Sequence, residues 1–174
     1  PSQFPDNPSP AQVAQSAIGQ FDVRVSPLQM AMVSAAIANR GVLMKPRLVN
    51  RILAADLTVM SRPQTEELGR AVSTGTADKL TDMMEAVVTS GTGTRAQLDG
   101  VRVAGKTGTA EQGKDAQGRQ RPPNAWFTAF APADDPQVAV AVIVEDGGTL
   151  GDEASGGRVA APIAKKVMEA VISQ

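Results

Sequence analysis

The segment Val101–Gln112, VRVAGKTGTAEQ, gathers a cation, two hydroxyls and two glycines within a few residues. Its two valines at alternating positions favour a strand. Alternate side chains of a strand point to opposite faces, so Lys106 and Gly108 share one face. Thr107 and Thr109 share the other. A cation and hydroxyls beside a backbone reduced to glycine suit an anionic, peptide-like ligand that lies along a strand edge.

One alternative reading of this segment is a nucleotide-binding P-loop, because Gly100–Thr107 fits the pattern G-x-x-x-x-G-K-[ST]. A P-loop requires a strand before its first glycine and a helix that starts at the lysine. The segment Ala96–Asp99, which precedes the first glycine, does not have the pattern of a buried strand. Glycines and mixed polar residues follow Thr107 and disfavour a helix there. The context therefore favours a strand, and a P-loop nucleotide binder remains the lesser hypothesis.

Further segments accompany the K-T-G residues in a fixed order. They are IGQ at Ile18–Gln20, VSPLQMA at Val25–Ala31, SGTGT at Ser90–Thr94 and AWFTAFAP at Ala125–Pro132. K-T-G is one of three site motifs of the penicillin-binding protein and serine β-lactamase superfamily. The order and spacing of all these segments resemble the transpeptidase domain of class B penicillin-binding proteins of the A type. The resemblance runs from Ile18 to the C-terminus.

The other two site motifs of that family are missing from the sequence. No serine is followed by a lysine three residues later, so the S-x-x-K nucleophile motif is absent. No serine is followed by an asparagine two residues later, so the S-x-N motif is absent too. The chain opens on Pro1. We therefore expect residues 1–174 to be the C-terminal portion of one transpeptidase domain, with the nucleophilic serine in an N-terminal portion absent from this chain.

Composition excludes several classes of function. With 17 basic and 18 acidic residues, one Trp, four Phe and no Tyr, the chain lacks the charge and the aromatic platform of a nucleic-acid binder. It has no Cys and no His, which excludes the usual zinc sites and any catalysis by a Cys-His or Ser-His-Asp set. We expect no metal and no cofactor. A Ser-Lys mechanism needs neither residue type and remains open.

The sequence shows no apolar run near the roughly 18 residues of a transmembrane helix, and no signal peptide. The resemblance implies a parent protein held at the extracytoplasmic face of the bacterial cell membrane by an N-terminal anchor missing from this chain. It also implies a role in peptidoglycan synthesis, and through it in cell division and cell shape.

Patterning predicts an α+β fold: an antiparallel sheet flanked by helices. Helices are expected at Ala11–Ile18, Leu28–Asn39, Ala77–Thr89 and Gly157–Ser173, and strands at Val42–Met44, Arg47–Leu53, from Val101, Ala125–Ala131 and Val138–Glu145. The segments Ala54–Thr76 and Asp146–Gly157 are interpreted as irregular and as a flexible acidic loop, respectively.

Three expectations concern packing. The apolar helix Leu28–Asn39 should be deeply buried. The last helix should pack on the sheet, with its apolar stripe formed by Val159, Ile163, Val167, Ala170 and Val171. Ser90–Thr94 is interpreted as a helix cap and turn that shapes the connection to the strand from Val101.

The resemblance implies a serine D,D-transpeptidase that acts on peptidoglycan stem peptides and binds β-lactam antibiotics. Lys106 would hold the terminal carboxylate of the substrate and help to keep the missing S-x-x-K lysine neutral. The hydroxyls of Thr107 and Thr109 would bind the same carboxylate, and Gly108 would let the substrate lie against the strand. The backbone N–H of Thr109 would be an oxyanion donor.

This chain alone is expected to be inactive and to require the upstream part of the same protein as its partner. The alternative within the same fold is a β-lactam sensor or a catalytically inactive pseudo-enzyme, which keeps K-T-G but does not turn over cell-wall peptide.

Overall fold

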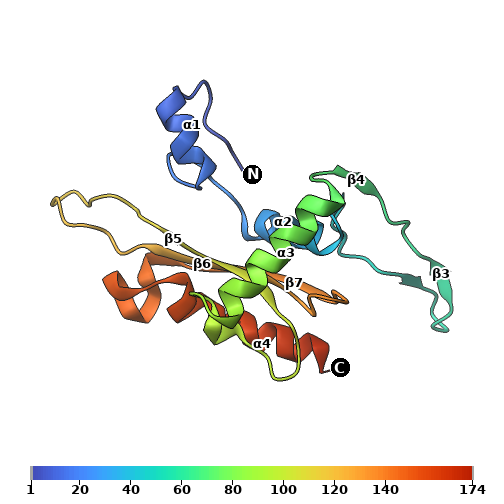
Figure 1. Ribbon diagram of the computed structural model, residues 1–174. Coiled ribbons are helices and arrows are strands. Elements are labelled where there is room, and N and C mark those ends of the chain that lie inside the picture. Colours follow the sequence, from blue (N-terminus) through green and yellow to red (C-terminus); the bar gives the residue numbers. More distant parts are fainter. Residues whose placement is uncertain (1, 174) are drawn as a thin grey trace.

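The centre of the molecule is an antiparallel sheet of three strands, seen in a computed structural model that describes residues 2–173. The strands follow the order β5 (Ala104–Ala110), β6 (Asn124–Ala131) and β7 (Val138–Val144). Lys106 pairs with Thr128 and Gly108 with Trp126. Figure 1 shows the connection between β5 and β6 projecting from one end of the sheet. The α+β architecture expected from the sequence is confirmed.

The register sorts the side chains of the sheet into two faces. Phe127, Ala129 and Val140 are buried on one face, and Ala104 and Phe130 on the other. This arrangement follows from the period of two in β-strands and from the tight turn at residues 132–136. Both faces of β6 are therefore covered, and β6 is the middle strand of the sheet.

Helix α4 (Ala161–Ile172) covers the face that holds Phe127, as expected, but with a different stripe (Figure 1). Ala161, Ala164 and Met168 are fully buried, while residues 163, 167 and 171 of the predicted stripe are exposed. The predicted stripe was therefore wrong. The small side chains of the alanines let the helix approach the valines of β7 closely, and larger branched residues on that side would hold it away.

The opposite face is covered by α2 (Pro27–Ala38), while α3 (Thr74–Thr89) packs along β5 and contributes Met84 to this face and Val88 to the face that holds Phe127. The side chain of Ser26 accepts a hydrogen bond from the N–H of Gln29 and begins α2. The expected deep burial of α2 was wrong. Ala36 and Ser34 are buried, but Leu28 and Val33 on its other side are exposed. In the described chain α2 meets the sheet on one side only.

An arm of paired strands follows α2 and projects from the body (Figure 1). Strand β1 (Val42–Met44) pairs with β4 (Glu67–Arg70), and β2 (Ile52–Leu53) pairs with β3 (Val59–Ser61). The expectation of irregular structure at Ala54–Thr76 was therefore wrong. These strands are mostly exposed, so they carry no alternating pattern that a sequence can reveal.

Short helical turns complete the chain. Helix α1 (Pro10–Ala17) begins with a capping box formed by Ser9 and Gln12. Short helical turns lie at η1 (Thr94–Ala96), η2 (Glu145–Glu153) and η3 (Gly156–Ala160), and η2 is interrupted by non-helical residues such as Gly148. The last two lie mostly in the segment expected to be a flexible loop. Along residues 2–173, no helix has the length and apolar character needed to cross a membrane.

Candidate functional site

The four residues Lys106–Thr109 lie together in the wall of a cleft of about 480 Å³. Strands β5 and β6 form one side of the cleft, and the loop from Ile18 to Val25 before α2 forms the other. Strand β5 pairs only with β6 among the described residues, so its outer edge is free of sheet partners. An extended ligand therefore has both a cleft and an unpaired strand edge to bind.

Lys106 places its ammonium at this edge. Its Nζ donates a hydrogen bond of 2.7 Å to the carbonyl oxygen of Thr107, and no carboxylate in residues 2–173 forms an ion pair with it. The side chain also borders an apolar cavity of about 370 Å³ between α2 and α3. A cation without a bound carboxylate in a cleft attracts an anionic group of a ligand.

Thr107 is fixed from the side. Its hydroxyl lies 2.7 Å from the hydroxyl of Thr92, which belongs to the loop after α3. The turn expected at Ser90–Thr94 is present, since the N–H of Gly93 donates to the carbonyl of Val87. The contact with Thr107 is an additional role that the sequence did not reveal. Thr109, in contrast, makes no side-chain hydrogen bond within the described part of the chain.

Two glycines form a layer beneath the K-T-G residues. A Cβ on Gly156 would overlap the carbonyl oxygen of Trp126 and lie 2.8 Å from that of Gly108. A Cβ on Gly157 would overlap the carbonyl oxygen of Thr92. Backbone therefore packs directly on backbone at this point. The pair of glycines before the last helix is the sequence signal for this packing.

Comparison with known proteins places the chain in one family. Residues 2–169 match the family described as "Penicillin binding protein transpeptidase domain". The chain is 47% identical over 164 residues to peptidoglycan D,D-transpeptidase PbpA of Mycolicibacterium smegmatis. This alignment covers 94% of this chain and 33% of that protein. It is 42% identical over 185 residues to the protein of the same name from Mycobacterium tuberculosis, covering 97% of this chain and 36% of that protein.

Solved structures agree. Penicillin-binding protein A from M. tuberculosis, solved as a ceftriaxone acyl-enzyme complex, superposes with a TM-score of 0.88 at 42% identity, over 98% of this chain and 38% of that one. Penicillin-binding protein 3 from the same organism superposes with a TM-score of 0.81 at 29% identity, over 99% of this chain and 40% of that one. The chain thus spans about a third of the length of the curated relatives it matches. With its K-T-G strand at the edge of the sheet, it belongs to the penicillin-binding protein transpeptidase family.

Proposed function

We propose that this chain is the K-T-G portion of a serine D,D-transpeptidase whose nucleophile lies in an N-terminal portion of the same domain. The serine attacks the peptide bond between two terminal D-alanines and releases the last one. An amine of a neighbouring stem peptide then attacks the acyl-enzyme, which forms the cross-link and frees the serine. The observation that carries this proposal is the edge strand with an unpaired lysine in a cleft. β-Lactams acylate the same serine.

The carboxylate of the terminal D-alanine binds at Lys106. The ammonium has no carboxylate partner within residues 2–173, and it lies beside the carbonyl of Thr107 at the cleft wall. The hydroxyls of Thr107 and Thr109 border the same cleft and add hydrogen bonds to the carboxylate. Gly108 lets the substrate backbone approach, because it places no side chain in the cleft wall.

The N–H of Thr109 stabilises the oxyanion. In an antiparallel ladder, alternate residues of an edge strand direct both main-chain groups away from the partner strand. The carbonyl of Thr107 accepts from Lys106 at the edge, and Thr109, two residues on, has the same orientation. One preorganised donor of this kind contributes roughly 3–4 kcal/mol in the transition state. The second donor comes from the N-terminal portion.

The full protein acts at the extracytoplasmic face of the cell membrane, held there by an anchor in its N-terminal portion. Its partners are peptidoglycan stem peptides, β-lactams and the upstream part of its own chain. Support comes from the family membership and from the relatives named as peptidoglycan D,D-transpeptidases.

The test uses a fluorescent penicillin. It is incubated with this chain alone and with the protein that includes the N-terminal portion, and the labelled residue is located by mass spectrometry. We expect a label only on the N-terminal portion, and a loss of at least tenfold in labelling rate with Lys106→Ala. Lys166→Ala, an exposed lysine on α4, is the matched control and should label normally.

Labelling of this chain when it is incubated without the N-terminal portion would contradict the proposal. A normal labelling rate of the Lys106→Ala variant would contradict it too. If penicillin labels the protein but a stem peptide is not turned over, the protein is a β-lactam sensor or pseudo-enzyme instead.

A further inference from the structure

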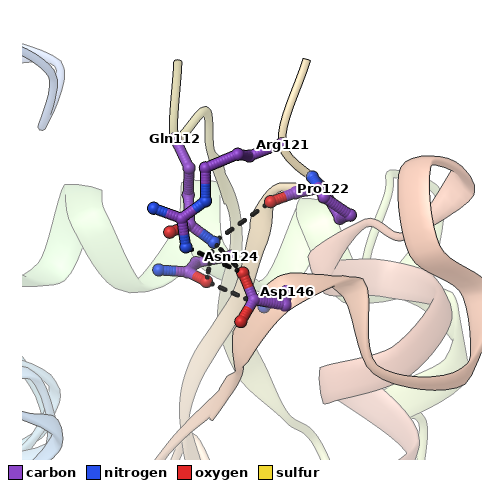
Figure 2. Close-up of polar contacts among 5 residues, drawn as sticks. All are labelled: Gln112, Arg121, Pro122, Asn124 and Asp146. Carbon is purple, nitrogen blue, oxygen red and sulfur yellow. Dashed lines mark hydrogen bonds and ion pairs between the residues drawn. The ribbon is translucent and has the colours of Figure 1, made fainter. Parts of the chain in front are cut away.

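A cluster of polar side chains joins the ends of the three sheet strands (Figure 2). The Nε2 of Gln112, just after β5, donates to Oδ1 of Asn124 at 2.7 Å, to Oδ1 of Asp146 at 2.8 Å and to the carbonyl of Pro122 at 3.1 Å. Arg121 pairs with Asp146 at 3.2 Å. Asn124 begins β6 and Asp146 follows β7, so the cluster fixes all three strands at one end.

This network determines which way the amide of Asn124 points. Its Oδ1 accepts from Gln112 and from the backbone N–H of Asp146, at 2.7 and 3.0 Å. Turning the amide over would place its NH₂ group against two donors, so the assignment is unambiguous. The Nδ2 of Asn124 forms no hydrogen bond with residues 2–173, and Figure 2 shows it on the side away from Asp146. The side chain borders the same cleft as the K-T-G residues.

The distance from the outer edge of β5 to β6 determines which part of a ligand can reach the Nδ2 of Asn124. Asn124 pairs with Ala110, one residue beyond Thr109 on β5. Neighbouring strands lie about 4.8 Å apart, so a ligand on the outer edge of β5 lies roughly 10 Å from β6. Ala110 is small and leaves the path over β5 open. A long ligand side chain on the face of Ala110 can therefore reach Asn124, whereas the ligand backbone cannot.

The proposed function gives the direction of the ligand. With the carboxylate at Lys106 and the reacting carbonyl at Thr109, the remainder of the acyl donor continues along β5 toward Ala110 and Gln112. The stem residue that precedes the two D-alanines therefore lies level with Asn124.

We propose that Asn124 is a specificity-determining residue that donates a hydrogen bond to an oxygen at the end of a long stem-peptide side chain. The group bound is a carboxylate or carboxamide on the residue before the two D-alanines. Gln112 and Asp146 are positioning residues that hold the amide in this orientation. The inference rests on the proposed function.

The test compares two acyl donors on the protein that includes the N-terminal portion. Both are stem-peptide thioesters and differ only in the residue before the D-alanine: 2-aminopimelyl, whose side chain ends in a carboxyl group, or 2-aminoheptanoyl, which ends in a methyl group. The readout is the ratio of the two kcat/KM values, which does not depend on the fraction of folded enzyme. One hydrogen bond of about 1 kcal/mol predicts a preference of roughly fivefold for the carboxyl donor.

Asn124→Ala should reduce this ratio to about one. Asn124→Asp keeps the acceptor oxygen but replaces the donor with a second acceptor, so it should reverse the preference. Gln112→Ala should lower the ratio in part, because the amide is then free to rotate. Asn50→Ala, an exposed asparagine of the arm, should leave the ratio unchanged.

A ratio that stays at the wild-type value in Asn124→Ala overturns the inference, and so does a wild-type ratio near one. Labelling by penicillin is measured in parallel on every variant. If the wild-type protein is not labelled, it is the proposed function that fails.

Discussion

The hydroxyls of Thr92 and Thr107 lie 2.7 Å apart and join the loop after α3 to the K-T-G strand. One of these residues lines the cleft, and the other reaches it from a segment fifteen residues earlier. The hydroxyl of Thr107 is thus held in place before any ligand arrives. Preorganisation of this kind lowers the cost of ordering a ligand-binding group.

Removing the support of Thr107 should slow acylation. We expect Thr92→Val to lower the second-order rate constant for acylation by penicillin about threefold to tenfold, since one hydrogen bond contributes about 1 kcal/mol. Thr92→Ser keeps the hydroxyl and should restore most of the rate. Thr149→Val, at an exposed threonine, is the control. An equal loss in Thr92→Ser would mean that packing of the methyl group, not the hydroxyl, is the cause.

The glycine layer under the strand should tolerate no side chain. Gly156→Ala places a Cβ against the carbonyl oxygen of Trp126, and only a backbone shift can relieve the overlap. We expect a loss of about 3 kcal/mol in the free energy of unfolding, measured by urea titration. Gly75→Ala on α3 meets nothing within 4 Å and should instead stabilise by about 0.5–1 kcal/mol. Similar values for the two variants would refute the packing argument.

The pair Ser34 and Thr128 should behave asymmetrically. Their hydroxyls lie 2.6 Å apart, Ser34 is fully buried, and Thr128 also lies within 3.1 Å of the carbonyl of Val140. Thr128→Val leaves the hydroxyl of Ser34 buried without this partner, at a cost of about 1–3 kcal/mol. Ser34→Ala should cost less, because Thr128 keeps its carbonyl acceptors. A double variant more stable than Thr128→Val alone would confirm the coupling, and strict additivity would exclude it.

The stability of the connection between β5 and β6 should depend on pH through the carboxyl group of Asp115. The backbone N–H of Arg119 holds the pKa of this carboxyl below its usual value, with help from the guanidinium of Arg119 and the N–H of Gln117. The stabilisation is therefore fully present above the ordinary aspartate pKa of about 3.9 and is lost as the pH falls through the lowered pKa. The amide proton shift of Arg119, followed by NMR, should titrate below pH 4 or so. It should not titrate in Asp115→Asn, and a midpoint above the usual aspartate value would contradict the assignment.

The features that the sequence predicted correctly depend on residues close together in the chain. The K-T-G strand and most helix bounds follow from short-range patterns and caps, such as Ser26 before α2. The start of the strand was wrong, because β5 begins at Ala104 and not at Val101. What it missed depends on residues far apart in the chain. The contact between Thr92 and Thr107, the layer at Gly156 and the pairing of β1 with β4 arise only when the chain is folded.

The face of α4 was missed for a related reason. Val167 is more hydrophobic than Ala164, but Ala164 is buried against the sheet and Val167 is exposed. The smaller side chain allows the helix to approach the sheet more closely. The apolar pattern alone carries no information about how close two elements come.

The open edge of β5 limits how a substitution can remove the main-chain groups that face the cleft. A ligand that binds the edge uses main-chain groups, and among substitutions only proline removes a backbone N–H. Substitutions other than proline therefore leave these donors in place. Proline would delete one of them, and because the N–H groups at the outer edge point away from β6, it would do so without removing a hydrogen bond between β5 and β6. Short of proline, the loss of these donors requires displacement of the strand as a whole, and the glycines packed behind it leave little room for that displacement.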